Sequence, residues 1–138
     1  MSDFDPSKID QYQNTLISNL GMEAIKVQKD EVIFKMPADE RTVQRFGILH
    51  GGASVALAET VASIGATLNI DLNTHYAVGL EINANHLRPV PKGEWVQAEG
   101  KPLHVGRKTQ LWEIKIYNKE RKLTCVSRCT LAVNTKTK

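Results

Sequence analysis

The pattern of apolar and polar positions divides the first part of the chain into a helix and a hairpin. An Asp-Pro-Ser motif at residues 5–7, followed by apolar residues at helical spacing, predicts a capped amphipathic helix over about residues 6–20, which Gly21 ends. Residues 23–27 and 31–36 are joined by a polar turn, and apolar residues alternate with polar ones in the second segment. This alternation predicts a half-buried β-hairpin.

The middle of the chain contains a long apolar segment, residues 53–66, which is rich in alanine. A helix that is apolar on almost every side is a buried helix, and Gly51 and Gly52 allow the backbone to turn sharply into it. After this helix the pattern changes to period two, which predicts four strands in a meander. These strands cover residues 76–88, 94–105, 109–118 and 123–134.

The order of these elements predicts an α+β fold. Because strands and helices do not alternate as βαβ units, we expect an antiparallel sheet, and this sheet must wrap around the long central helix to cover it. The 138 residues fit a single domain, 1–138, with a polar C-terminal tail at residues 135–138.

Charge and composition narrow the function classes. The net charge is +3, and the cations are interspersed with acids, a distribution that does not favour a nucleic acid as partner but suits an anionic small ligand. The N-terminus is acidic and polar, unlike a signal peptide. Glu59 interrupts the apolar segment, which is shorter than a membrane span. We therefore expect a cytoplasmic protein with no membrane or nucleic-acid partner.

The two cysteines, Cys125 and Cys129, lie four residues apart in a predicted strand. This spacing puts them on one face but about 13 Å apart, which is too far for a disulfide. No histidine near them has the spacing of zinc ligands. We expect reduced core cysteines, no metal site and no cofactor.

Glu59 is the residue least expected where it stands, because an ionised carboxylate in a buried helix costs several kcal/mol unless it is paired or solvated. A salt bridge and a catalytic role both remain open. Ser63 lies one turn further along the same face. His50 and Gly51 stand at the start of the helix, where free N–H groups would polarise a carbonyl oxygen.

Gly51 and Glu59 are about 12 Å apart along the helix. One acyl group could not easily contact both residues of the same helix. A symmetric dimer would solve this by presenting the helix start of one subunit to Glu59 of the other.

Two further polar clusters are candidates for binding. On the strand at 76–88, Asn83 and Asn85 share one face while His86 and Arg88 share the other, and one of these faces could complete a polar pocket. A lone histidine in a strand is more often a structural residue, and this role is also open. The segment at 104–108 carries cations beside a glycine, which suits an exposed phosphate or simply keeps the surface soluble.

Three motifs in order resemble the hotdog-fold acyl-CoA thioesterases. The first is Q-x-FGILHGGA at residues 44–53 with AET at 58–60 and Ser63, and the others are VGLEINANHLRP at 78–89 and LHVGRK at 103–108. The resemblance implies a helix wrapped by a sheet, subunits paired through long strands, and two dimers forming a homotetramer. It also implies two active sites at each dimer interface, and coenzyme A as part of the substrate rather than as a cofactor.

Residue roles follow from this resemblance alone. Glu59 would be the nucleophile or the general base that activates water, and Ser63 would hold the water or Glu59. The Gly51 N–H would polarise the thioester carbonyl, while Gln44 and His50 from the opposing subunit would position it. His86 would line the acyl pocket, and Gly79 and Arg88 would also bind the substrate. The nucleotide phosphates would meet Arg107, Lys108 and His104.

The resemblance is strongest to the bacterial subgroup that acts on aryl- and acyl-CoA esters. It favours 1,4-dihydroxy-2-naphthoyl-CoA, an intermediate of menaquinone synthesis, as the substrate. Phenylacetyl- or hydroxybenzoyl-CoA, medium-chain acyl-CoA and acyl carrier protein thioesters are alternatives. The same fold supports dehydratases, which arrange a histidine and an acid differently. It also supports acyl-CoA sensors, which carry an added DNA-binding segment longer than the roughly twenty residues before the first strand here.

Overall fold

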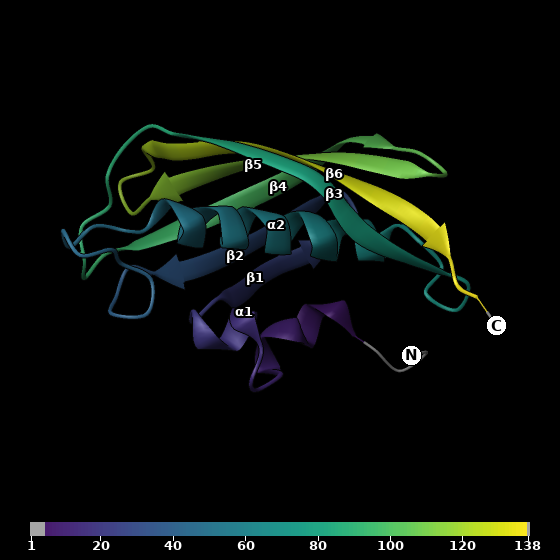
Figure 1. Ribbon diagram of the computed structural model, residues 1–138, viewed down its shortest axis with the longest axis horizontal. Coiled ribbons are helices and arrows are strands. Elements are labelled where there is room, and N and C mark those ends of the chain that lie inside the picture. The colour runs from purple at the N-terminus through teal and green to yellow at the C-terminus, as the bar shows by residue number, and fades with distance from the viewer. Residues whose placement is uncertain (1–4, 138) are drawn as a thin grey trace.

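A computed structural model describes residues 5–137 and shows one curved antiparallel sheet around a long helix (Figure 1). This confirms the predicted α+β hotdog architecture. The strands are β1 (Glu23–Gln28), β2 (Glu31–Pro37), β3 (His75–His86), β4 (Trp95–Val105), β5 (Thr109–Asn118) and β6 (Leu123–Thr135). The central helix α2 is Gly51–Leu68.

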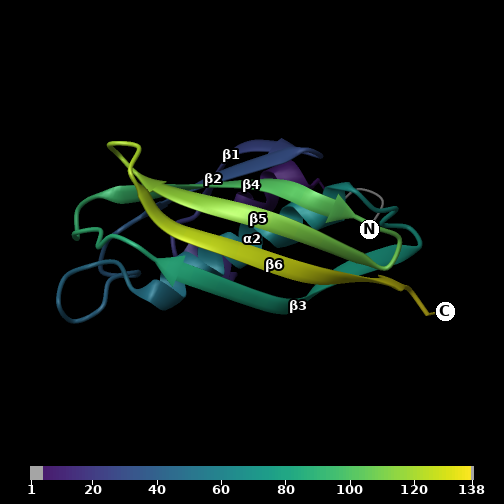
Figure 2. The ribbon, with the colours of Figure 1, turned by 90° about the horizontal axis from the view of Figure 1, so that it is seen from above.

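The strand order corrects one prediction. The sheet runs β1-β2-β4-β5-β6-β3, so only β4, β5 and β6 form a meander, and β3 pairs with β6 at the edge (Figure 2). Alternation along a strand reveals its two faces but not its neighbours. Here α2 follows β2 and crosses the concave face, so that the chain reaches the far edge before β3 begins. This leaves one side of β3 without a partner strand within residues 5–137.

The core lies between α2 and the sheet. Nine residues of α2 are buried, and Gly65 lies directly against the indole of Trp112. Trp112 Nε1 donates to Gln110 Oε1 (2.9 Å), and Gln110 Nε2 donates to Ala66 O (3.2 Å). α2 extends two residues beyond the apolar segment 53–66 at each end, and it is long and apolar enough to pass for a membrane span by length and composition. Its burial against the sheet accounts for that composition.

The N-terminal helix is not continuous, which corrects the predicted span of about 6–20. A 3-10 helix η1 (Pro6–Gln11), capped by Asp5 as predicted, is followed by a break and a short helix α1 (Leu16–Asn19). In the break Asn14 has φ +61°, and Thr15 begins a new capping box with Ser18. The local capping bonds outweigh the helical spacing of the apolar residues.

The two cysteines and the C-terminus complete the fold. Cys125 and Cys129 are buried and free. β6 continues through Thr135, so the predicted tail at 135–138 begins one residue later. Lys138 and residues 1–4 lie outside the described residues.

Candidate active site

The segment before α2 is fixed by backbone hydrogen bonds to two other loops. His50 N donates to Thr42 O (2.9 Å), and Leu49 N donates to Val90 O (2.8 Å). Ile48 also forms an isolated bridge with Pro91. The start of α2 therefore has a defined position relative to the end of β3, which comes just before Val90.

His50 caps α2 with its side chain. Gly52 N donates to His50 Nδ1 (2.7 Å). A ring nitrogen that accepts a hydrogen bond carries no proton, so the neutral ring holds its proton on Nε2, where it is a donor. Gln44 is oriented in the same way, because its Oε1 accepts the Phe46 N–H and its amide nitrogen remains a donor. Two side chains at the helix start thus keep donors available.

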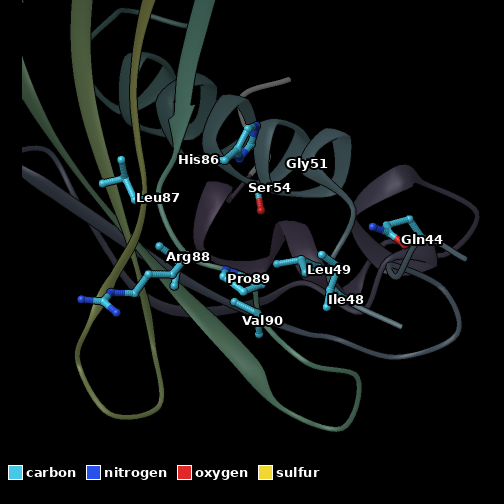
Figure 3. A pocket seen from close by; sticks show the side chains of 11 residues that line it. Gln44, Ile48, Leu49, Gly51, Ser54, His86, Leu87, Arg88, Pro89 and Val90 are labelled. Carbon is cyan, nitrogen blue, oxygen red and sulfur yellow. The ribbon is translucent and has the colours of Figure 1, made fainter. Parts of the chain in front are cut away.

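A pocket of about 440 Å³ opens at this helix start (Figure 3). The His86 ring lies over Gly51, with Nε2 3.0 Å from the position that a Cβ atom on Gly51 would occupy. The Gly51 N–H has no hydrogen-bond acceptor within residues 5–137, as is usual for the first N–H of a helix. The pocket is lined by Gln44, Ile48, Leu49, Gly51, Ser54, His86, Leu87, Arg88, Pro89, Val90 and Thr124. This arrangement can bind and polarise a carbonyl oxygen.

Glu59 lies in a different hollow, of about 390 Å³, which Ser63 also lines. Its Oε2 is 2.5 Å from the position that a Cβ atom on Gly79 would occupy, so Gly79 leaves room for the carboxylate. Within residues 5–137 the Glu59 carboxylate forms no hydrogen bond or ion pair. The salt-bridge interpretation of Glu59 therefore fails for the described chain. Ser63 and Glu59 share the hollow without a hydrogen bond between them.

Cys129 on β6 lies close enough to Glu59 to feel its charge. Burial raises the pKa of the Cys129 thiol to about 11, with further contributions from the negative charges of Glu59 and Glu81. Burial also raises the pKa of the Cys125 thiol. Both thiols therefore stay protonated near neutral pH and are not candidate nucleophiles.

The predicted site residues thus form separate groups on one chain. The helix start brings together Gln44, His50, Gly51, His86 and Arg88. The hollow in the middle of α2 brings together Glu59, Ser63 and Gly79. Glu59 does not line the pocket at the helix start.

The predicted phosphate-binding cations lie near the other end of α2. Arg107 lines a hollow of about 360 Å³ with Asn69, the residue that caps the C-terminus of α2. Arg107 and Lys108 together line an adjoining hollow of about 460 Å³. His104 lies against Gly106 in the same hairpin. This group is exposed to solvent and stands apart from both Gly51 and Glu59.

The two faces of β3 have different roles. Asn83 and Asn85 are exposed and line none of these hollows, and Asn83 donates to Glu81 (3.3 Å). His86 and Arg88 line the pocket at the helix start. Of the two faces that the sequence left open, the one with the histidine therefore lines the pocket.

Several lining residues were not predicted from the sequence. Ser54 is buried one turn after Gly51, and helical spacing alone could have identified it. Thr124 comes from β6, and Ile9, Leu16 and Ile17 reach the hollow beside Glu59 from the N-terminal segment. No local pattern marks these residues, because their role depends on contacts between distant parts of the chain.

Comparisons with known proteins agree with one another. The chain matches the family described as "Thioesterase superfamily" over residues 46–125, a segment that omits η1 and α1. ComA2 of Bacillus subtilis, named as a candidate esterase, is 53% identical over 121 residues, which are 88% of this chain and 95% of ComA2. The 1,4-dihydroxy-2-naphthoyl-CoA hydrolase of Listeria monocytogenes is 46% identical over 123 residues, 89% of this chain and 98% of that protein. The crystal structure of thioesterase HI1161 from Haemophilus influenzae matches with a TM-score of 0.88 at 46% identity and covers 96% of this chain and 92% of that one.

Proposed function

Because the chain belongs to the thioesterase superfamily and is a thioester hydrolase, we propose that its substrate is an aryl- or acyl-CoA thioester and that Glu59 is the catalytic carboxylate. The observation that carries this proposal is the carboxylate of Glu59, which has no partner within residues 5–137 and lies on a helix whose other side is packed against the sheet. A carboxylate that takes part in no ion pair or hydrogen bond of the fold is available for chemistry.

Hydrolysis breaks the C–S bond, adds the hydroxyl of water to the acyl carbon and releases coenzyme A as a thiol. Glu59 either accepts the proton of the attacking water or attacks the carbonyl carbon itself, forming an anhydride that water then opens. The developing oxyanion is placed at the Gly51 N–H, with the oriented donors of Gln44 and His50 beside it. Ser63 is proposed to hold the water next to Glu59.

We propose that the site is completed by a second copy of the chain. β3 has twelve residues and an edge without a partner strand in the described part of the chain, and it exposes Val78 (44%) and Leu80 (62%). An exposed apolar edge strand is a liability unless it is paired. Antiparallel pairing of two β3 edges about a two-fold axis would join the sheets and offer the α2 start of one subunit to Glu59 of the other. A homotetramer of two such dimers remains part of this proposal.

A complementation experiment tests the shared site. Glu59→Gln and Gln44→Ala each damage every site of their own homodimer. Co-expressed with different tags, they form heterodimers in which one site carries both defects and the other is intact. Purified heterodimers should then regain about half the wild-type activity if Glu59 and Gln44 of one site come from different subunits. If both residues came from one subunit, every heterodimer site would carry one defect and activity would stay low.

The favoured substrate is 1,4-dihydroxy-2-naphthoyl-CoA, supported by the relative from Listeria. We propose that the phosphates of its coenzyme A bind Arg107, Lys108 and His104 and that His86 lines the acyl pocket. Gly79 and Arg88 are proposed as further substrate-binding residues. Since ComA2 carries no substrate in its name, phenylacetyl-, hydroxybenzoyl- and medium-chain acyl-CoA and acyl carrier protein thioesters stay in the test panel. A cytoplasmic location and hydrolysis without a cofactor belong to the same proposal.

The deciding measurement is thiol release from this panel, followed with a thiol-reactive dye. We expect an aryl preference and a loss of roughly 10²–10⁴-fold in kcat for Glu59→Gln. The isosteric amide keeps the volume of the side chain and removes its charge, so the variant should fold normally. Near-normal turnover by Glu59→Gln would refute the role of Glu59. Binding without turnover of any thioester would instead favour a sensor.

A further inference from the structure

The hollow beside Glu59 is built from two parts of the chain that are distant in sequence. α2 contributes Ala56, Glu59, Thr60, Ser63 and Ile64, and the N-terminal segment contributes Ile9, Leu16 and Ile17. Figure 1 shows η1 and α1 alongside α2, on the side away from β5 and β6. A hollow with a reacting carboxylate at one place and apolar side chains around it suits an apolar group attached to the reacting carbonyl.

On the basis of the proposed function, we infer that the N-terminal segment, residues 6–19, forms one wall of the acyl pocket and that Leu16 sets the size of the acyl group. Leu16 is 59% exposed although it lines this hollow. A bound acyl group would bury its side chain, which no protein atoms cover completely. The wall lies outside the segment that matches the family, residues 46–125. It can therefore differ in shape without any change to the catalytic residues.

A hydrogen bond from Asp10 ties this wall to the sheet. Asp10 Oδ2 accepts the Ala24 N–H (2.8 Å), and Ala24 belongs to β1, an edge strand of the sheet. Within the described chain β1 has no neighbouring strand on that side, so the Asp10 carboxylate accepts the Ala24 N–H in place of a strand partner. We assign Asp10 as a positioning residue, because it touches no reacting atom but holds η1, and with it Ile9, beside the hollow.

The size of the pocket is tested with two thioesters that differ in acyl volume, benzoyl-CoA and 1,4-dihydroxy-2-naphthoyl-CoA. Leu16→Ala should raise the ratio of kcat/KM for the larger to the smaller about tenfold, and Leu16→Trp should lower it about tenfold. Ile25→Ala is the matched control, since Ile25 is 51% exposed on β1 and lines no hollow described above. A ratio that stays at the wild-type value in both Leu16 variants would overturn the inference.

Failure of the proposed function has a different signature. If the wild-type protein turns over neither thioester, the ratio of their dissociation constants replaces the ratio of kcat/KM. The Leu16 variants must then shift this binding ratio in the same directions, and unchanged binding ratios would again overturn the inference.

Asp10 is tested through Asp10→Ala and Asp10→Asn. The alanine variant loses the acceptor and should move the acyl preference at least threefold from the wild-type ratio, whereas the amide oxygen of asparagine can still accept the Ala24 N–H and should restore it. A lowered melting temperature with an unchanged ratio would show a merely structural role and refute the assignment.

Discussion

The two sides of α2 differ in how completely their groups are packed and hydrogen-bonded. Toward the sheet, Gly65 lies against the Trp112 ring, and a hydrogen-bonded chain runs from Trp112 through Gln110 to the backbone of α2. Away from this contact, the Glu59 carboxylate lies in an open hollow without a partner in the described chain. The first side supplies packing and satisfied hydrogen bonds. The second keeps a charge that contributes nothing visible to stability, and this is where chemistry is expected.

The largest expected effect comes from adding a single methyl group at Gly79, on the open side. Its φ is not in the left-handed region, so alanine fits the backbone, but the new Cβ would stand 2.5 Å from Glu59 Oε2. The carboxylate is the end of a flexible side chain and can move away at little cost in stability. A displacement of about 1 Å should lower kcat/KM about 100-fold, or about 2.7 kcal/mol of transition-state stabilisation. Steady-state kinetics and thermal unfolding of Gly79→Ala check both halves of this expectation.

Because Gly79 lies on the free-edge strand, the oligomeric state of Gly79→Ala must be compared with that of the wild type. A variant that keeps its mass in solution and its melting temperature but loses activity fits a displaced carboxylate. Full activity would mean that the position of Glu59 in this hollow does not matter for catalysis.

The opposite result is expected from the same substitution on the packed side. Gly65→Ala gains up to about 1 kcal/mol of helix propensity. Its Cβ, however, would collide with the rigid, fully buried ring of Trp112, and overpacking costs about 1–3 kcal/mol. Since Gln110 holds that ring by a hydrogen bond, the upper part of this range applies, and a net loss of about 2 kcal/mol is expected. Urea unfolding measures it, and a variant as stable as the wild type would show that Trp112 can move.

The packed side is also the part of the fold that could be predicted from the sequence. The apolar segment at 53–66 and the alternation between Leu111 and Tyr117 report burial directly, and α2 and β5 were found where these patterns place them. The alternation did not reveal that β3 pairs with β6, because the period of a strand specifies its faces and not its neighbour. The break between η1 and α1 was missed because Thr15 and Ser18 cap locally against the helical spacing.

The open side was only partly predictable. Glu59 was conspicuous because a charge in an apolar helix is costly, and Ser63 followed from helical spacing. The neighbours that shape the hollow, such as Leu16 and Gly79, come from elements 43 and 20 residues away along the chain. Their proximity is a product of the completed fold, and no local pattern encodes it.

The smallest expected effect tests whether the two sides are coupled through Cys129. Its thiol has a pKa of about 11 in the fold, raised from 9.0 by burial first and then by Glu59 and Glu81. Between pH 9 and 11 the folded protein therefore binds more protons than the unfolded chain, so stability falls as pH rises through this window and is unaffected below it. The free energy of unfolding at pH 10 should be about 1 kcal/mol lower than at pH 8 because of this thiol. Urea unfolding at both pH values should show a smaller loss of stability in Cys129→Ala than in the wild type. Other groups that titrate at alkaline pH contribute equally to both proteins, so their contribution cancels in this comparison. Glu59→Gln should reduce the loss only slightly, because burial is the larger cause. A loss in Glu59→Gln as small as that in Cys129→Ala would mean that the charge of Glu59, rather than burial, is the main cause of the raised pKa of Cys129. The charge on the open side of α2 would then have an electrostatic cost for the packed side.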